Sequence, residues 1–334
     1  MKSKLLIVSL LSLITVLPIY GGDREGLLTP ENQVIALRHI IEQTDDLDQK
    51  EAALTLMSQA GTYQALTYAA SMMETKKTAK MAAKAVWEIL EAHPEYNGIE
   101  SREMLTKATK QLKGKQKKLA KAWLQNANQN EEGFVCLFNG KNLDGWKGLV
   151  ENPIARSRMS TKELKEAQKK ADELMKRDWI VENGELVYIG NGWDNICTQN
   201  NYADFELLVD WRLDPNGKEP DAGVYLRGAP QVQIWDIRRT NVGAQVGSGG
   251  LYNNQKYRST PTSVEDNKLG EWNTFRIVMR GDKVSVWLNG VNVVDNIVLE
   301  NYWDRKLPIF PSEQIEMQAH GSRCYFRNIY VKEL

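Results

Sequence analysis

Four short segments alternate polar and apolar side chains, as strands with one buried face do; they are residues 205–213, 222–228, 231–236 and 315–321. Their polar positions carry amides, acids, arginines and rings instead of the Lys, Thr and Ser of an ordinary solvated face. Such groups form directional hydrogen bonds and stack on rings, which suits a sugar ligand. The sequence therefore predicts a sugar site built from these outward positions: Glu206, Tyr225, Arg227, Gln231, Gln233, Trp235, Glu316, Gln318 and His320.

Eight of the ten tryptophans lie after residue 133, which also favours carbohydrate as the ligand. Trp193 and Trp235 are expected to contact it, whereas Trp211 and Trp287 are expected in the core. The glycine-rich stretch 245–256 carries Tyr252 and Asn253, which are expected to contact the ligand if the stretch closes as a lid. A plain surface loop is the alternative.

Charge and cysteine spacing exclude several classes of protein. Lys plus Arg and Asp plus Glu both number 43, so a uniformly basic nucleic-acid binder is disfavoured. The chain has three histidines and no C-x-x-C pair, so a zinc site is not predicted. No cofactor is required. A divalent metal bound by Glu206, Asp236 or Glu316 stays open, although no ligand spacing demands one.

Residues 1–22 have the layout of a cleavable secretory signal, with Lys2 and Lys4 ahead of an apolar run at 5–18. That run is shorter than the roughly 20 residues that span a bilayer, and no cysteine follows it to carry a lipid. We expect a periplasmic or secreted protein without a stable membrane span after cleavage. An uncleaved N-terminal anchor is the alternative.

Residues 27–128 predict a small all-α domain, a solenoid or a bundle. Thr29 followed by Pro30 is a helix start, and apolar residues then recur at helical spacing. The lysine-rich stretch 107–121 is interpreted as a solvated face.

Residues 133–334 predict a mainly β domain, an antiparallel two-sheet sandwich or jelly roll. Asn-Gly pairs at 183–184 and 289–290 indicate hairpins. Ser160 and Glu163 form a capping box that opens a single helix. We expect the three cysteines to be buried thiols that act as small hydrophobic side chains. A disulfide between Cys136 and Cys324, which fall in the first and last strands, is the alternative.

Five motifs give the second domain a resemblance to a known family. They are GFVCLFNGKNLDGW, ADFELLVDWRL, AGVYLRG with QVQIWD, GEWNTFRIVMRGDKVSVWLNGVNVVDN, and IEMQAHGSRCYFRNIYVKEL. In this order they resemble the 3-keto-disaccharide hydrolases, also described as 3-keto-glucoside 1,2-lyases/3-keto-2-hydroxyglucal hydratases. The resemblance covers about residues 133–334 and implies a concanavalin A-like sandwich. Cys197 and Gln231 depart from the family pattern, where an aromatic residue and an acid are common, and both changes can alter substrate choice.

The chemistry that the resemblance implies is loss of the C2 proton beside a C3 ketone, elimination at C1, and hydration of the resulting 2-hydroxyglucal. We hypothesise that His320 is the acid/base, because its pKa lies naturally near neutrality. Asp236 or Glu206 would be its carboxylate partner or the second acid/base. Arg227 would stabilise the enolate, and Gln233 and Gln318 would hold hydroxyls.

Two other functions stay open. The stretch 231–236 is similar to the catalytic strand of laminarinase-type glycosidases, but Gln231 and Gln233 stand where carboxylates are needed, which disfavours double displacement. The sandwich could instead be a non-catalytic glycan-binding module on a helical scaffold. The expected partner is an oligosaccharide or 3-keto-glycoside, with a sugar oxidoreductase as a further partner of the helical domain.

Overall fold

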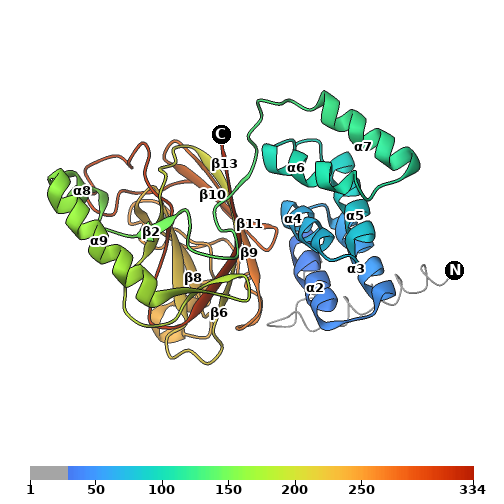
Figure 1. The fold of residues 1–334 in the computed structure, drawn as a ribbon. Helices are drawn as coiled ribbons and strands as arrows, with labels where there is room; N and C mark the ends of the chain where they lie inside the picture. The colour runs from blue at the N-terminus through green and yellow to red at the C-terminus, as the bar shows by residue number, and fades with distance from the viewer. Residues whose placement is uncertain (1–28) are drawn as a thin grey trace. The chain divides into compact units, whose positions relative to one another are not determined.

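The structure is a computed structural model that describes residues 29–334. The predicted signal peptide at residues 1–22 lies outside these described residues. Contacts divide the chain between Val135 and Cys136 into two compact units, which can be followed by colour in Figure 1.

The first unit is a set of short helices in its described part, as the sequence predicts. Thr29 caps the helix Pro30–Gln43 by accepting a hydrogen bond from the Asn32 N–H, and Pro30 occupies its first turn. No helix between residues 29 and 334 is long and apolar enough to cross a membrane. The helices are α2 (Pro30–Gln43), α3 (Leu47–Ala60), α4 (Tyr63–Ser71), the 3₁₀ turn η1 (Met72–Glu74), α5 (Ala79–Ala92), α6 (Ile99–Ala108) and α7 (Gly114–Asn126).

A close approach between α3 and the end of α5 fixes part of this unit. Gly61 ends α3 with a φ of 67°, and its N–H donates to the Met57 carbonyl. A Cβ at Gly61 would lie 2.2 Å from Nε2 of His93. The position therefore requires glycine for both its backbone angle and its space, and His93 is part of the packing.

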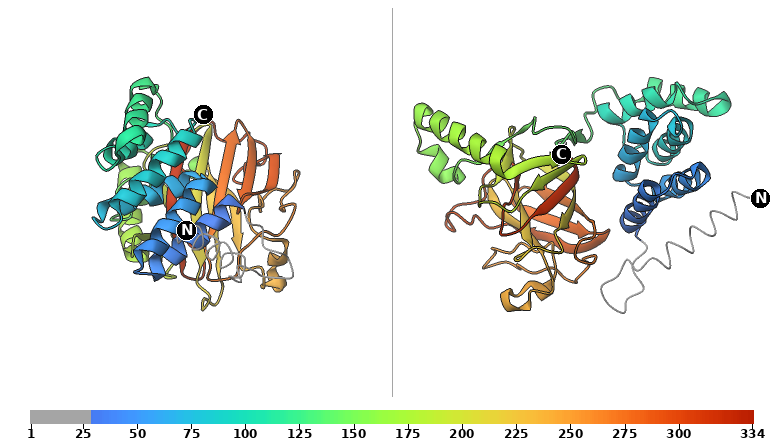
Figure 2. Two further views of the ribbon diagram at one scale, coloured as in Figure 1. Left: turned by 90° about the vertical axis from the view of Figure 1, so that its right-hand side faces the viewer. Right: turned by 60° about the horizontal axis from the view of Figure 1, so that its bottom comes forward.

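The second unit is a sandwich of two antiparallel sheets, which confirms the predicted fold class. The larger sheet has the order β11-β10-β9-β6-β13-β4-β3, with β1 also paired to β13, and the smaller has the order β2-β5-β12-β7-β8. The strands of the larger sheet can be followed in Figure 2. The strands are β1 (Val135–Cys136), β2 (Trp146–Gly148), β3 (Trp179–Glu182), β4 (Glu185–Tyr188), β5 (Ile196–Thr198), β6 (Phe205–Leu213), β7 (Asp221–Leu226), β8 (Ala229–Trp235), β9 (Asn273–Arg280), β10 (Lys283–Leu288), β11 (Val291–Val298), β12 (Glu316–Met317) and β13 (Cys324–Glu333).

The core lies between the sheets and follows the alternation seen in the sequence. From the larger sheet, β6 contributes Phe205 and its alternate neighbours up to Leu213. From the smaller sheet, Val224, Ile234 and Met317 point the same way. The polar side chains between these apolar positions must then face outward from their own sheet.

Local signals also place the connections. Both Asn-Gly pairs are hairpin turns with positive φ at each residue, at 53° and 79° for 183–184 and at 50° and 85° for 289–290. The capping box of Ser160 and Glu163 opens α9 (Thr161–Asp178), which follows the short α8 (Pro153–Ser157). Helix α9 packs on β2, where a Cβ at Gly148 would lie 2.0 Å from the Ala171 carbonyl oxygen.

The three cysteines, all within the described residues, are free thiols, although β1 and β13 are paired. Cys197 and Cys324 are buried, as expected, whereas Cys136 is only partly buried. One expectation about the sandwich was wrong. Trp287 is not in the core: it is half-buried and lies under the Arg276 guanidinium at 4.3 Å.

Candidate functional site

The outer face of the smaller sheet collects most of the predicted site residues. Glu316 of β12 lies directly opposite Cys197 of β5 and Tyr225 of β7. Gly223 and Asp221, two and four residues before Tyr225 on β7, lie opposite residues of β8. We call this outer surface the polar face; it comprises Asp221, Tyr225, Gln231, Gln233, Trp235, Glu316, Gln318 and His320.

Three glutamines form a hydrogen-bonded cluster at the centre of the polar face. The Gln231 Nε2 donates to the Oε1 atoms of Gln233 and, at 3.0 Å, of Gln318. Gly223 makes room for this amide cluster, because a Cβ there would lie 2.9 Å from the Gln318 Oε1 and 3.0 Å from the Gln231 Nε2. The Gln233 Nε2 donates to the Asp221 Oδ1 at 2.7 Å, so the cluster also orients that carboxyl.

Asp221 stands between an imidazole and a guanidinium. Its Oδ2 lies 3.7 Å from the His320 Nδ1 and 3.6 Å from the Arg239 Nη1. Burial raises the pKa of Asp221 to about 7, although the Gln233 amide and Arg239 favour its charged form. Burial, together with the nearby charge of Arg239, lowers the pKa of His320. His320 is therefore a neutral imidazole at pH 7, able to accept a proton.

Aromatic rings flank this group, as sugar sites usually require. Trp193 is 63% exposed, and its ring meets His320 edge to face with centroids 4.8 Å apart. The Tyr252 ring is 50% exposed and meets Trp235 in the same manner at 5.3 Å.

Glu316 is the most deeply buried acid of the polar face, with 1% of its surface exposed. Burial raises its pKa to about 8, against the opposing effects of Arg156 and an Asn195 hydrogen bond. Burial and the proximity of Glu316 also raise the pKa of Tyr225. At neutral pH both groups hold their protons and can donate hydrogen bonds.

Three buried polar atoms in this region have no hydrogen-bond partner: the Glu316 Oε2, the His320 Nδ1 and the Arg239 Nη1. Unsatisfied buried atoms are costly and rare, so their concentration beside one sheet face indicates a ligand site. Between residues 29 and 334, no group of three or more His, Cys, Asp or Glu side chains is arranged to hold a metal ion.

The structure does not bring Glu206 or Arg227 to the polar face. Glu206 projects from β6 on the outer side of the other sheet, where its Oε1 accepts from the Arg276 Nε at 2.5 Å. Arg227 turns away because its φ is 50° and a register shift follows Val224, which together break the strand alternation. Its guanidinium instead binds the Ala203 carbonyl at 2.6 Å and the Asp204 carboxylate at 2.6 Å.

Asp236 is also wrongly assigned as the partner of His320. Its carboxylate accepts from both the backbone N–H and the Nε of Arg238, at 3.1 and 2.9 Å. Burial opposes ionisation of Asp236, but the hydrogen bonds from Arg238 outweigh it and lower the pKa. The carboxylate that His320 faces is Asp221.

The stretch 245–256 is pinned to the edge of β8. The Gln233 N–H donates to the Gly250 carbonyl at 2.9 Å, and the Gly249 N–H donates to the Gln233 carbonyl at 2.8 Å. The Tyr252 N–H donates to the Gln231 carbonyl at 3.3 Å. Backbone pairing of this kind favours a fixed wall of the site over a lid.

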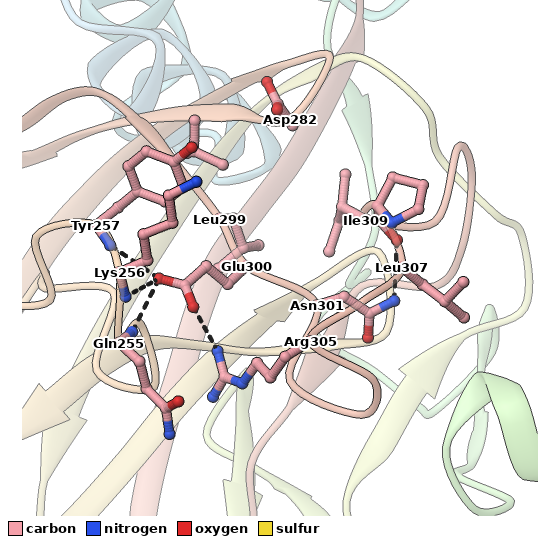
Figure 3. A pocket seen from close by; sticks show the side chains of 12 residues that line it. Gln255, Lys256, Tyr257, Asp282, Leu299, Glu300, Asn301, Arg305, Leu307 and Ile309 are labelled. Atoms are coloured by element: carbon pink, nitrogen blue, oxygen red, sulfur yellow. Dashed lines mark hydrogen bonds and ion pairs between the residues drawn. The ribbon is translucent and has the colours of Figure 1, made fainter.

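A hollow of about 310 Å³ lies at the far end of the same stretch, shown in Figure 3. The Glu300 Oε1 there accepts from the backbone N–H groups of residues 255, 256 and 257 at 2.7–2.9 Å. Its Oε2 accepts from Arg305 at 3.0 Å, and Arg305 also donates to the Asn253 carbonyl at 2.7 Å. These bonds fix the position of Tyr252 and Asn253, whereas none of the predicted site residues lines the hollow.

Sequence reasoning missed Asp221 and Arg239. Extending the alternation of 222–228 back by one residue would have placed Asp221 on the same side as Tyr225. Arg239 lies in the connection after β8, directly before the 3₁₀ turn η2 (Thr240–Val242), so no strand alternation pointed to it.

Comparison with known proteins agrees with this architecture. A family model described as a 3-keto-alpha-glucoside-1,2-lyase-like domain matches residues 133–332. The chain belongs to this family. A 3-keto-disaccharide hydrolase from Bacteroides thetaiotaomicron is 22% identical over 254 residues, which are 61% of this chain and 79% of that protein. The chain is therefore a 3-keto-disaccharide hydrolase-like member of a carbohydrate-active family.

Two solved structures of similar chains illustrate the fold. A proposed glycosyl hydrolase from Parabacteroides distasonis is 23% identical, with a TM-score of 0.44 and coverage of 60% of this chain and 94% of that chain. A carbohydrate-binding module from Bacillus subtilis is 10% identical, with a TM-score of 0.34 and coverage of 57% and 96%.

Proposed function

We propose that the sandwich cleaves 3-keto-glucosides or 3-keto-disaccharides by removing the C2 proton and eliminating the substituent at C1. Water would then add to the resulting 2-hydroxyglucal, so that the net reaction is hydrolysis. The observation that carries the proposal is the set of three buried atoms beside the polar face that make no hydrogen bond, which belong to an acid, an imidazole and a guanidinium. Elimination needs one group of each kind: a proton donor, a base and a cation for the enolate.

His320 is the proposed base. Its Nδ1 faces the Asp221 carboxyl at 3.7 Å, so Nε2 is the nitrogen that accepts the C2 proton. The C3 ketone acidifies that proton, and the electron pair of the C2–H bond moves into the enolate. Asp221 then stabilises the imidazolium, and its contact with His320 can tighten once substrate is bound.

Glu316 is the proposed acid. Because its pKa is raised to about 8, it is protonated at neutral pH and can give a proton to the oxygen that leaves C1. Four residues of extended chain separate it from His320, roughly 13 Å between Cα atoms. Side chains that lean towards each other from both ends can reach the two reacting atoms of one sugar.

Arg239 is the proposed cation that stabilises the enolate, the role that the sequence assigned to Arg227. Its Nη1 is buried without a hydrogen-bond partner and is available to the developing enolate oxygen. Gln231, Gln318 and Tyr225 are proposed to hydrogen-bond the sugar hydroxyls. The sides of the sugar ring would contact Trp193, Trp235, Tyr252 and Asn253. Gln233 positions Asp221, because its amide already donates to that carboxyl at 2.7 Å.

The test is incubation of the purified protein with 3-keto-α- and 3-keto-β-glucosides, followed by NMR and by the absorbance of the enone. We expect release of the aglycone by the wild type and a loss of about 10²–10⁴-fold in His320→Ala. Folding of the variant is checked by circular dichroism. Unchanged turnover in folded His320→Ala would remove it from the mechanism, whereas binding of unoxidised glycans without turnover would support a glycan-binding module.

Export and an oxidoreductase partner are further parts of this proposal. Lys2, Lys4 and the apolar run that follows support cleavage of residues 1–22 and a periplasmic or secreted location. N-terminal sequencing of the mature protein tests this. An oxidoreductase must supply the 3-keto sugar, and a defined complex of that enzyme with the full chain would test docking at the helical unit.

A further inference from the structure

The last part of the helical unit carries an uninterrupted positive charge. Seven lysines fall between residues 107 and 121, and no Asp or Glu occurs from Met104 to Asn130. Six of these lysines are exposed, and the ion pairs found within residues 29–334 include none of the seven. We call the exposed set the lysine surface: Lys107, Lys110, Lys113, Lys115, Lys118 and Lys121.

The charge is local, because the whole chain has a formal net charge of zero. Between residues 29 and 75 the same unit has seven acidic residues and only two basic ones, Arg38 and Lys50. The first part of the unit is therefore acidic and its last part is basic, with a stretch of mixed charge at 76–103 between them. Such separation creates a field at one end that attracts anions over about a Debye length.

The stability of α7 does not explain these lysines. Only Ala120 of this helix is buried, and its first turn contains no acidic residue. Cations near the start of a helix oppose its dipole and each costs roughly 0.3–1 kcal/mol. Lys115, Lys118 and Lys121 recur every three residues, which places them on one face of the helix, turned away from the buried Ala120.

We propose that the lysine surface binds an acidic polysaccharide, one whose sulfate or uronate groups project along the polymer. Point charges on flexible stems suit such a ligand. A bilayer would require exposed apolar side chains to insert, yet Leu119, 38% exposed, is the only large apolar residue of α7 that is more than partly exposed. Single-stranded nucleic acid would require exposed rings for stacking, and Trp123 is only partly exposed. A polyanionic glycan is also the ligand that would hold a carbohydrate-active chain near its substrates.

The test measures binding of the full chain to heparin, as the probe polyanion, over a series of NaCl concentrations. We expect affinity to fall linearly with salt on logarithmic axes. With the counterion release of duplex DNA as a guide, the triple variant Lys115→Gln, Lys118→Gln, Lys121→Gln should reduce the slope by about 3. Its affinity at 0.15 M salt should fall about 100-fold.

The matched control replaces three exposed lysines of the sandwich helix α9 by glutamine, namely Lys165, Lys169 and Lys170. This control should bind heparin as the wild type does, and both triple variants should keep wild-type turnover of 3-keto-glucosides. Heparin affinity that is unchanged in the α7 variant would overturn the proposal. Tighter binding to duplex DNA or to phosphatidylglycerol vesicles than to heparin, alginate or polygalacturonate would overturn the assignment to a glycan.

Discussion

Replacing Glu316 by glutamine should change how the stability of the sandwich depends on pH. Burial raises the pKa of Glu316 from 4.5 to about 8, so between these values the folded state holds a proton that the unfolded state has lost. The free energy of unfolding of the wild type must therefore fall as pH rises through this window. At about 1.4 kcal/mol per pH unit, the interval corresponds to as much as about 5 kcal/mol.

Glutamine has no such proton, so Glu316→Gln should gain stability relative to the wild type from pH 4.5 to 8 and no further above that. Urea unfolding followed by tryptophan fluorescence measures this, because eight of the ten tryptophans lie in the sandwich. Glu316→Met should show the same pH trend, since it also lacks a titrating group. A stability difference between wild type and Glu316→Gln that stays constant from pH 5 to 8 would refute the assignment of a protonated buried acid.

Three further outcomes follow from the contacts described above. Arg239→Met should lower kcat about 10²–10³-fold through loss of enolate stabilisation, while folded Arg227→Met should keep the wild-type kcat; equal losses would contradict the exchange of roles. Gly223→Ala should lower kcat/KM by up to about 100-fold, because the new methyl group displaces the amide cluster, and an unchanged value would show that the cluster does not position substrate. Gly61→Ala should destabilise the helical unit by about 2 kcal/mol or more, from backbone strain and the clash with His93. Adding His93→Ala should recover part of that loss in thermal unfolding followed by circular dichroism, and no recovery would argue against the clash.

Much of the fold was predictable because its signals are local. A capping box, two Asn-Gly turns and the alternation along β6, β8 and β12 each depend on neighbours within a few residues. These signals state which side of a strand is buried. They do not indicate which sheet the strand joins. For that reason the sequence pattern grouped Glu206 with residues of the opposite sheet.

The errors at the site have equally specific causes. Arg227 left its expected face because a single residue with positive φ and a register shift ended the alternation of β7. The Asp236 carboxylate accepts its hydrogen bonds from Arg238, two residues away. Neither periodicity nor spacing in the sequence reveals such a pair. The partner of His320 had to be found in space, because Asp221 lies about a hundred positions earlier in the chain.

Burial of two thiols affects how the folded sandwich responds to redox conditions. Burial raises the pKa of Cys197 to about 12 and raises the pKa of Cys324 as well. Thiolates are the reactive species in oxidation and exchange, so these two side chains resist both glutathione and oxidising folding catalysts. In the folded sandwich, Cys197 and Cys324 are therefore shielded from sulfur redox chemistry in reducing and oxidising surroundings alike.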